Sequence, residues 1–135
     1  MALPDDLVTR LNGDPYIGGI GAALVSIAPG TATYSLTIGP AHLNFLGIGH
    51  GAVIFALADA AFAAACNSHG VGWVAAGVDI RFKQAVTVGT RLEATAREAE
   101  RLDDRGVYPI EVLDVDSDTV VAKATGHARR KRPAT

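Results

Sequence analysis

The run from Gly51 to Cys66 is the feature that most constrains the fold of this chain. Its residues are small or apolar, and its one charged side chain is Asp59. A helix that is apolar on every side must be covered on every side, so we expect a buried central helix wrapped by the rest of the chain. An ionised carboxylate there loses several kcal/mol of hydration unless something compensates. Asp59 must therefore be neutral, paired or open to a cleft.

The length of 135 residues fits a single domain spanning residues 1–135. The net charge of −2 provides no general field that would attract nucleic acid, so we expect no nucleic-acid partner. One basic cluster, Arg129-Arg130-Lys131-Arg132, lies near the C-terminus. By the general behaviour of charge runs we expect residues 129–135 to form a solvated, disordered tail.

Cys66 is the only cysteine and lies in the apolar run, so we expect a small buried side chain and no disulfide. The four histidines are scattered, and no metal site is expected. The first residues lack the basic and apolar regions of a signal peptide, and the run 51–66 is short for a bilayer span and carries a carboxylate. We therefore expect a cytoplasmic protein with no membrane partner.

The periodicity of the rest of the chain predicts an α+β fold. Polar and apolar residues alternate after the central helix, and the turns Ala28-Pro29-Gly30 and Asp103-Asp104-Arg105-Gly106 separate neighbouring runs. Val120, Ala122, Ala124, Gly126 and Ala128 share one face, which suits a strand packed closely against a helix. The predicted elements are a short helix over 5–12, strands over 20–28 and 31–38, a long helix from about His50 to 67–70 with Gly70 as its C′ residue, and strands over 74–83, 91–97, 107–115 and 119–128.

Two further expectations follow from this pattern. Pro109 cannot donate a ladder hydrogen bond, so we expect a bulge or an unpaired donor position within its strand. One curved antiparallel sheet can cover only part of the central helix, so we expect a second subunit to cover the rest.

The segment from His42 to Ser68 resembles the hot-dog-fold acyl-CoA thioesterases of the PaaI (phenylacetate degradation) type. The family pattern is an Asn, a His-Gly-Gly six residues later, and an Asp nine residues after the His; here these are Asn44, His50-Gly51-Ala52 and Asp59. The resemblance extends over nearly the whole chain. It implies a curved antiparallel sheet around one central helix, thioester hydrolysis, dimers that pair into tetramers, and no cofactor beyond the coenzyme A of the substrate. It also suggests an aromatic or arylacetyl acyl group.

Thioester hydrolysis needs a donor for the developing oxyanion and an activated attacking group. The first turn of a helix near His50 has unpaired N–H groups and the positive end of the helix dipole, and a glycine lets a carbonyl approach closely. We therefore expect Gly51 N–H to be the oxyanion donor. Asp59 is the expected nucleophile or general base, and the residues do not separate these roles. Ala52 replaces the second glycine of the family pattern, and its methyl group is expected to trim the pocket.

The spacing of these two residues predicts a dimer. Eight residues of helix separate Gly51 from Asp59, about 12 Å along the axis, whereas catalytic contacts are about 3 Å. If both residues act on one thioester, they must come from different subunits.

The supporting residues are less determined by the sequence. Asn44 is equally suited to orienting water or the acyl group and to capping its own loop. His50 suits a structural position at the helix start better than the role of a base. The CoA phosphates need cations, which Arg81, Lys83, Arg129 or Arg130 can supply, although all four also suit solvated positions. Asn12 and Asp14 are weaker candidates for closing the acyl pocket. His42, His69 and His127 are expected to be ordinary loop or surface residues.

Two other functions are compatible with such a fold. A non-catalytic acyl-CoA-binding protein would have the pocket without turnover, but it has little need of an acid in the central helix. A hydratase or dehydratase would need a His a few residues from the Asp, and the next one after Asp59 is His69, at the helix end. Thioester hydrolysis therefore fits these residues best.

Overall fold

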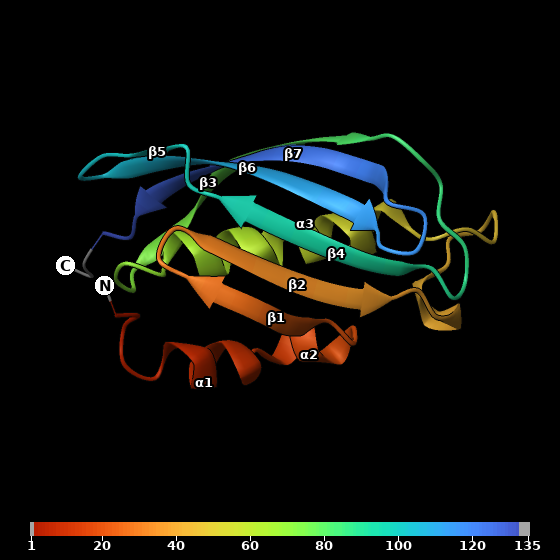
Figure 1. Cartoon of the computed structure of the whole chain (residues 1–135), viewed down its shortest axis with the longest axis horizontal. Helices are drawn as coiled ribbons and strands as arrows, with labels where there is room; N and C mark the ends of the chain where they lie inside the picture. Colours follow the sequence, from red (N-terminus) through yellow and green to blue (C-terminus); the bar gives the residue numbers. More distant parts are fainter. Residues whose placement is uncertain (1, 133–135) are drawn as a thin grey trace.

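The computed structural model describes residues 2–132 and contains one antiparallel sheet curved around a long helix (Figure 1). The helices are α1 (Leu7–Asn12), α2 (Pro15–Gly19) and α3 (Gly51–Cys66), with a 3-10 turn at Pro40–His42. The strands are β1 (Ala23–Ala28), β2 (Thr31–Thr37), β3 (Trp73–Phe82), β4 (Arg91–Arg97), β5 (Glu100–Arg101), β6 (Arg105–Asp114) and β7 (Thr119–Arg130). The sheet order is β1-β2-β4-β6-β7-β3, and β5 pairs with β6. The expected architecture of a curved sheet around one central helix is confirmed.

The inner face of the sheet packs against α3 through alternating small and apolar side chains. On β4, Leu92, Ala94 and Ala96 are buried, as the alternation predicted. On β7, Gly126 lies so close to the helix that a Cβ atom there would be 2.5 Å from the ring of Phe62. The expectation that β7 packs closely against the helix is therefore confirmed.

A bulge shifts the predicted face of β7 at one end. The register between β6 and β7 changes between Val112 and Leu113, and Val121 becomes the buried residue in place of Val120. Pro109 is the register partner of Thr125 on β7, but its nitrogen lies on the other side of β6, where the β4–β6 ladder ends at Ile110 and the β5–β6 ladder ends at Val107, so no ladder bond is lost. The expected unpaired position at the proline is therefore confirmed.

Three local expectations were incomplete or wrong. The short helix α2 and the two-residue strand β5 were not predicted. The helix α3 ends at Cys66 with Asn67 as its C-cap, and the left-handed glycine of the loop that follows is Gly72 (φ 116°), not Gly70. Strand β7 continues through Arg129 and Arg130 because both pair with β3. These two arginines therefore belong to the sheet and not to a disordered tail; of that tail, residues 133–135 lie outside the described residues.

Part of α3 and one sheet edge remain uncovered. Ala52 and Phe55 of α3 are exposed and Asp59 is half-buried, although their neighbours on the other sides of the helix are buried. Strand β3 lies at the edge of the sheet, and Ala75, Ala76 and Gly77 are exposed along it. Within residues 2–132, no helix is long and apolar enough to cross a membrane.

Candidate active site

The start of α3 leaves one backbone donor available. His50 is the N-cap residue, and its Nδ1 accepts a hydrogen bond from Ala52 N–H at 3.0 Å. The N–H of His50 itself donates to the carbonyl of His42 at 2.8 Å. Among the described residues, no group accepts from Gly51 N–H. The geometry therefore favours a structural role for His50 and leaves Gly51 as the donor that can meet a substrate oxygen.

The loop before α3 is held by Asn44 and His42. The Oδ1 atom of Asn44 accepts from Leu46 N–H at 2.9 Å and from Ile48 N–H at 3.3 Å, so this side chain does cap its own loop. No described residue accepts from its Nδ2 group. The two interpretations of Asn44 are therefore compatible, because the capped oxygen fixes the amide while its NH₂ group stays available.

His42 takes a larger part in the loop than the sequence indicated. Its Nδ1 accepts from Gly39 N–H at 2.9 Å, which leaves Nε2 as the donor to the carbonyl of Ile20 at 2.7 Å. This imidazole joins the start of the site loop to the segment between α2 and β1. It is a structural residue rather than an ordinary loop residue.

Two adjoining grooves open beside the start of α3. The first, called here the Asp59 groove, has a volume of about 680 Å³ and is lined by Tyr16, Gly51, Ala52, Phe55, Ala56, Asp59, Ile80 and Phe82. The second, the Asn44 groove, has a volume of about 300 Å³ and includes Asn44, Gly51 and Lys83. Gly51 and Phe82 line both grooves. A Cβ atom at Gly51 would lie 3.4 Å from the Phe82 ring, so the glycine keeps the junction between them open.

Asp59 is the half-buried carboxylate of the first groove. It has no hydrogen bond or ion pair among the described residues. Burial raises its pKa above the ordinary aspartate value, and the negative charge of Asp14 raises it further. The sequence allowed Asp59 to be neutral, paired or open to a cleft, and the structure shows a carboxylate that faces a cleft.

The segment around α2 closes one side of the Asp59 groove. Asp14 is the N-cap of α2, and its Oδ1 accepts from Tyr16 N–H at 3.1 Å and from Ile17 N–H at 3.2 Å. The Asp14 cap and the buried Ile17 therefore anchor α2, while Tyr16 lines the groove. Asp14 acts on the site through its charge, whereas Asn12 lines neither groove.

Sequence analysis did not identify the aromatic residues that line the Asp59 groove. Tyr16, Phe55 and Phe82 line it and stay largely exposed, at 63%, 36% and 52%. A signal existed for Phe55, which is four residues from both Gly51 and Asp59 and therefore on the same helix face. Tyr16 and Phe82 are distant in sequence, and only the fold brings them to α3.

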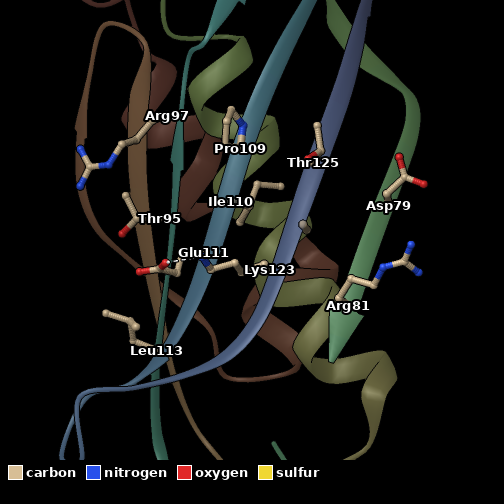
Figure 2. A pocket seen from close by; sticks show the side chains of 11 residues that line it. Asp79, Arg81, Thr95, Arg97, Pro109, Ile110, Glu111, Leu113, Lys123 and Thr125 are labelled. Atoms are coloured by element: carbon tan, nitrogen blue, oxygen red, sulfur yellow. Dashed lines mark ion pairs between the residues drawn. The ribbon is translucent and has the colours of Figure 1, made fainter. Parts of the chain in front are cut away.

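The four candidate cations for CoA do not gather at one place. Lys83 lines the Asn44 groove near Gly51. Arg81 lies on the outer face of the sheet, in a separate depression of about 780 Å³ (Figure 2). Its register partner on β7 is Lys123. The Lys123 ammonium forms an ion pair with the Glu111 carboxylate at 3.9 Å. Although Arg81 and Lys83 are only two residues apart, they line different depressions: β3 ends at Phe82, and the backbone N–H of Lys83 donates to the carbonyl of Val121.

Arg129 and Arg130 lie at the opposite end of β3 from Phe82. They pair with Val74 and Trp73, whereas Phe82 pairs with Ala122. Within one chain they are therefore remote from Gly51.

The remaining candidate side chains have structural positions. Burial raises the pKa of the Cys66 thiol to about 12, so it is not a nucleophile. His69 contacts Glu98 at 2.6 Å, which ties the loop after α3 to the end of β4, and His127 is half-exposed on β7. Among residues 2–132 no three His, Cys, Asp or Glu side chains are placed to hold a metal ion.

The chain is similar to known thioesterases in sequence and structure. The model of the thioesterase superfamily matches residues 46–121. The acyl-coenzyme A thioesterase PaaI of Escherichia coli (strain K12) is 37% identical over 107 residues, which cover 79% of this chain and 76% of the relative. The structure of the E. coli PaaI protein from the phenylacetic acid degradation operon superposes with a TM-score of 0.88, at 32% identity and with 93% and 91% of the two chains covered. A mutant structure of the phenylacetic acid degradation protein PaaI from Thermus thermophilus gives a TM-score of 0.83, 32% identity, and coverage of 87% and 99%.

Proposed function

The chain belongs to the thioesterase superfamily and is a thioester hydrolase with the hot-dog fold, and from this premise we propose that it hydrolyses aromatic acyl-CoA thioesters of the phenylacetyl or hydroxyphenylacetyl kind. The observation that carries the proposal is the unpaired, half-buried carboxylate of Asp59 in a groove that also contains Gly51. The groove is lined by three aromatic rings, which suits an aromatic acyl group. The products are the free acid and coenzyme A.

Gly51 and Asp59 have complementary roles in this proposal. The N–H of Gly51 donates to the thioester oxygen as negative charge develops on it, aided by the positive end of the α3 dipole. Asp59 either attacks the carbonyl carbon, so that the CoA thiolate leaves and water then hydrolyses the resulting anhydride, or removes a proton from a water that attacks the thioester directly. A raised pKa suits the second role. The proton that leaves the water finally protonates the departing thiolate. Asn44 lines the adjoining groove, and in this proposal its Nδ2 orients the water or the acyl group.

The proposal includes a dimer with active sites between subunits. Gly51 and Asp59 line one groove but remain about 12 Å apart along α3, so a thioester bound at one of them is out of reach of the other. A second subunit with its α3 antiparallel to the first would bring each Gly51 to the other chain's Asp59. The exposed edge of β3 and the uncovered face of α3 are the surfaces available for this contact. Pairing of two such dimers into a tetramer, and a cytoplasmic location, belong to the same proposal.

The test is thiol release from a panel of aryl, arylacetyl and aliphatic acyl-CoA thioesters by wild type and Asp59→Asn. We expect faster hydrolysis of the aromatic thioesters, and a loss of about 10²–10⁴ in kcat for Asp59→Asn. Asp118→Asn is the matched control, because Asp118 is exposed in the β6–β7 turn and asparagine tolerates its positive φ. Wild-type protein that binds acyl-CoA without releasing thiol would instead indicate an acyl-CoA-binding protein.

A further inference from the structure

The loop before α3 presents two large apolar side chains to solvent. Phe45 is 95% exposed and Leu46 is 67% exposed. Both belong to residues 44–48, called here the tip, and the ends of this loop are joined by a bridge between Leu43 and Gly49. Figure 1 shows that the loop extends past the start of α3. Adjacent exposed side chains of this size point to a contact with another surface.

The tip is held by its own backbone. The N–H of Asn44 donates to the carbonyl of Ile48 at 2.8 Å, and the N–H of Gly47 donates to the carbonyl of Asn44 at 3.0 Å. The side chain of Asn44 adds the two hydrogen bonds described above. Gly47 has a φ of 80°, which glycine adopts without strain. These contacts fix the backbone that exposes Phe45 and Leu46.

A further groove, called here the α1 groove, lies at the opposite end of α3. Its volume is about 620 Å³, and its apolar lining includes Leu11, Ala63, Val71 and Trp73. Asn67 fixes the groove from below. Its Nδ2 donates to the carbonyls of Ala63 at 2.9 Å and Trp73 at 3.1 Å, and its Oδ1 accepts from the N–H of Trp73 at 3.0 Å. The groove is therefore formed within the single chain and has room for an aromatic side chain.

The α1 groove continues the open face of α3. The residues of α3 that are not buried form one stripe along the helix: Gly51, Ala52, Phe55, Asp59 and Ala63. Ala63 follows Asp59 by one turn and lines the α1 groove, so this groove and the Asp59 groove lie on the same side of the helix. A partner helix packed along the stripe therefore reaches both grooves.

The tip and the α1 groove of one chain are too far apart to meet, because the 16 residues of α3 between them span about 24 Å. In the antiparallel dimer proposed above, the partner's Gly51 lies opposite Asp59. Ala63 and Asn67 then lie about 6 and 12 Å farther along the axis, in the direction in which the partner's loop extends. Phe45 and Leu46 precede Gly49 by four and three residues, a reach of about 10–13 Å. The distances match.

We propose that the tip of each subunit docks in the α1 groove of its partner, with Phe45 and Leu46 as the side chains that enter it. Two-fold symmetry makes the contact twice in each dimer. Burial of the two apolar side chains stabilises association. The rigid loop also sets the place of Gly51 against the partner's Asp59, so Phe45 is a positioning residue. This inference rests on the proposed function, because it uses the dimer in which Gly51 and Asp59 come from different subunits.

Cross-linking between the tip and the groove tests the contact directly. The double variant Leu46→Cys/Val71→Cys places one thiol on the tip and one in the groove, where Val71 is 48% exposed, whereas the native Cys66 is buried. We expect a short bis-maleimide to convert this variant into covalent dimers. Leu46→Cys/Val25→Cys is the matched control, because Val25 is exposed on β1, outside the groove. Absence of covalent dimers from the first variant, or an equal yield from the control, would overturn the proposal.

Sedimentation measures how much the tip contributes to association. We expect Phe45→Ala to raise the Kd of the dimer at least about tenfold, as for a buried aromatic anchor, and Phe45→Leu to restore most of the loss. Leu102→Ala is the control, because Leu102 is exposed in the β5–β6 turn. A Kd that Phe45→Ala does not change would contradict the docking.

The positioning role is tested at protein concentrations at which the Phe45→Ala dimer is fully assembled. We expect kcat of this dimer to fall about tenfold with KM near that of wild type, because a displaced Gly51 weakens a contact that matters in the transition state. Phe45→Leu should recover kcat. A fully assembled Phe45→Ala dimer with the kcat of wild type would show that the tip does not position Gly51.

The docking contact and the proposed function can fail separately. Covalent dimers joined from tip to groove that release no thiol from any acyl-CoA would reject the proposed function and support the docking. A wild-type enzyme that hydrolyses acyl-CoA but gives no such covalent dimers would overturn the docking and leave the function intact. A wild-type protein that sediments as a monomer would overturn the docking as well.

Discussion

The surroundings of Asp59 lower the stability of the folded protein and raise the reactivity of the Asp59 carboxylate. Most of α3 must be apolar to fill the curve of the sheet, yet the face at Ala52, Phe55 and Asp59 lacks cover within the chain. The carboxylate is therefore partly desolvated without a partner, and its pKa is raised by burial and by Asp14. A stabilising partner for Asp59 would lower that pKa and reduce its strength as a base.

The first prediction at this scale concerns stability and pH. Since the pKa of Asp59 is higher in the folded than in the unfolded chain, its ionisation costs stability at neutral pH, and protonation removes that cost as pH falls through the folded pKa. Asp59→Asn should therefore be at least as stable as wild type at pH 7. The difference should shrink on acidification and vanish near the ordinary aspartate pKa of about 3.9. Denaturant unfolding of both proteins across this pH range measures it; a variant less stable than wild type at pH 7 would show that Asp59 is a paired structural residue.

A second prediction separates the charge of Asp14 from its capping role. Asparagine is as good an N-cap as aspartate, so Asp14→Asn should keep the hydrogen bonds to Tyr16 and Ile17 and remove the negative charge. The pKa of Asp59 should fall, and the acid limb of the kcat/KM–pH profile should move to lower pH. An unmoved limb with intact folding would show that the charge of Asp14 does not reach the reacting carboxylate.

The sequence predicted those site residues that are joined by short chain segments. Asn44, Gly51 and Asp59 lie in one loop–helix segment, where spacing along the chain carries over into spacing in the fold. The groove wall from Tyr16 and Phe82 depends on contacts between distant segments, and no local pattern encodes them. The location of Arg129 depended on whether the last strand ended before or after it, which a charge run does not reveal.

Among the elements, β7 and α3 show how side-chain size sets the distance between layers. Gly126 lets the strand approach the ring of Phe62, which also packs on Tyr108 with ring centroids 5.8 Å apart. Gly126→Ala places a methyl group into that contact and should destabilise the protein by about 1–3 kcal/mol in denaturant unfolding. Gly70→Ala is the control, because nothing lies within 4 Å of an added Cβ there.

A compensating change tests the cause of that loss. In the Gly126→Ala background, Phe62→Leu should cost less than it does in the wild-type protein, because the smaller side chain makes room for the methyl group. Additive effects of the two substitutions would mean that the loss at Gly126 arises from the backbone and not from the ring.

The elements that the sequence predicted well are those with a clear period. The alternation of Leu92, Ala94 and Ala96 predicted β4, and the long run of small and apolar residues predicted α3. By contrast, α2 is a single turn that depends on the Asp14 cap and Pro15, and β5 has two residues that depend on pairing with β6. Elements of this size have too few residues for a periodic signal, and tertiary contacts determine them.

At the scale of the whole molecule, the sheet has two free edges of different character. Strand β1 at one edge is flanked by α1 and α2 (Figure 1), whereas β3 at the other exposes Ala75, Ala76 and Gly77 in succession. An exposed edge of small, uncharged residues is a template for pairing with another strand. The dimer proposed above accounts for the open face of α3, the edge of β3 and the separation of Gly51 from Asp59, and it requires a second copy of the chain.

The last prediction tests that requirement with one substitution at each edge. Ala75 is exposed in the single chain, so Ala75→Lys should leave the fold intact, but in a symmetric dimer each subunit brings a lysine to the shared edge and the charges repel. We expect the wild-type protein to sediment as a dimer or larger, and Ala75→Lys to shift toward monomer and lose thioesterase activity in parallel. Val25→Lys on β1 is the control, being exposed at the other edge. A monomeric variant that keeps full activity would show that one chain completes the site alone, and Asp59 would then have to act on a thioester that Gly51 of the same chain does not bind.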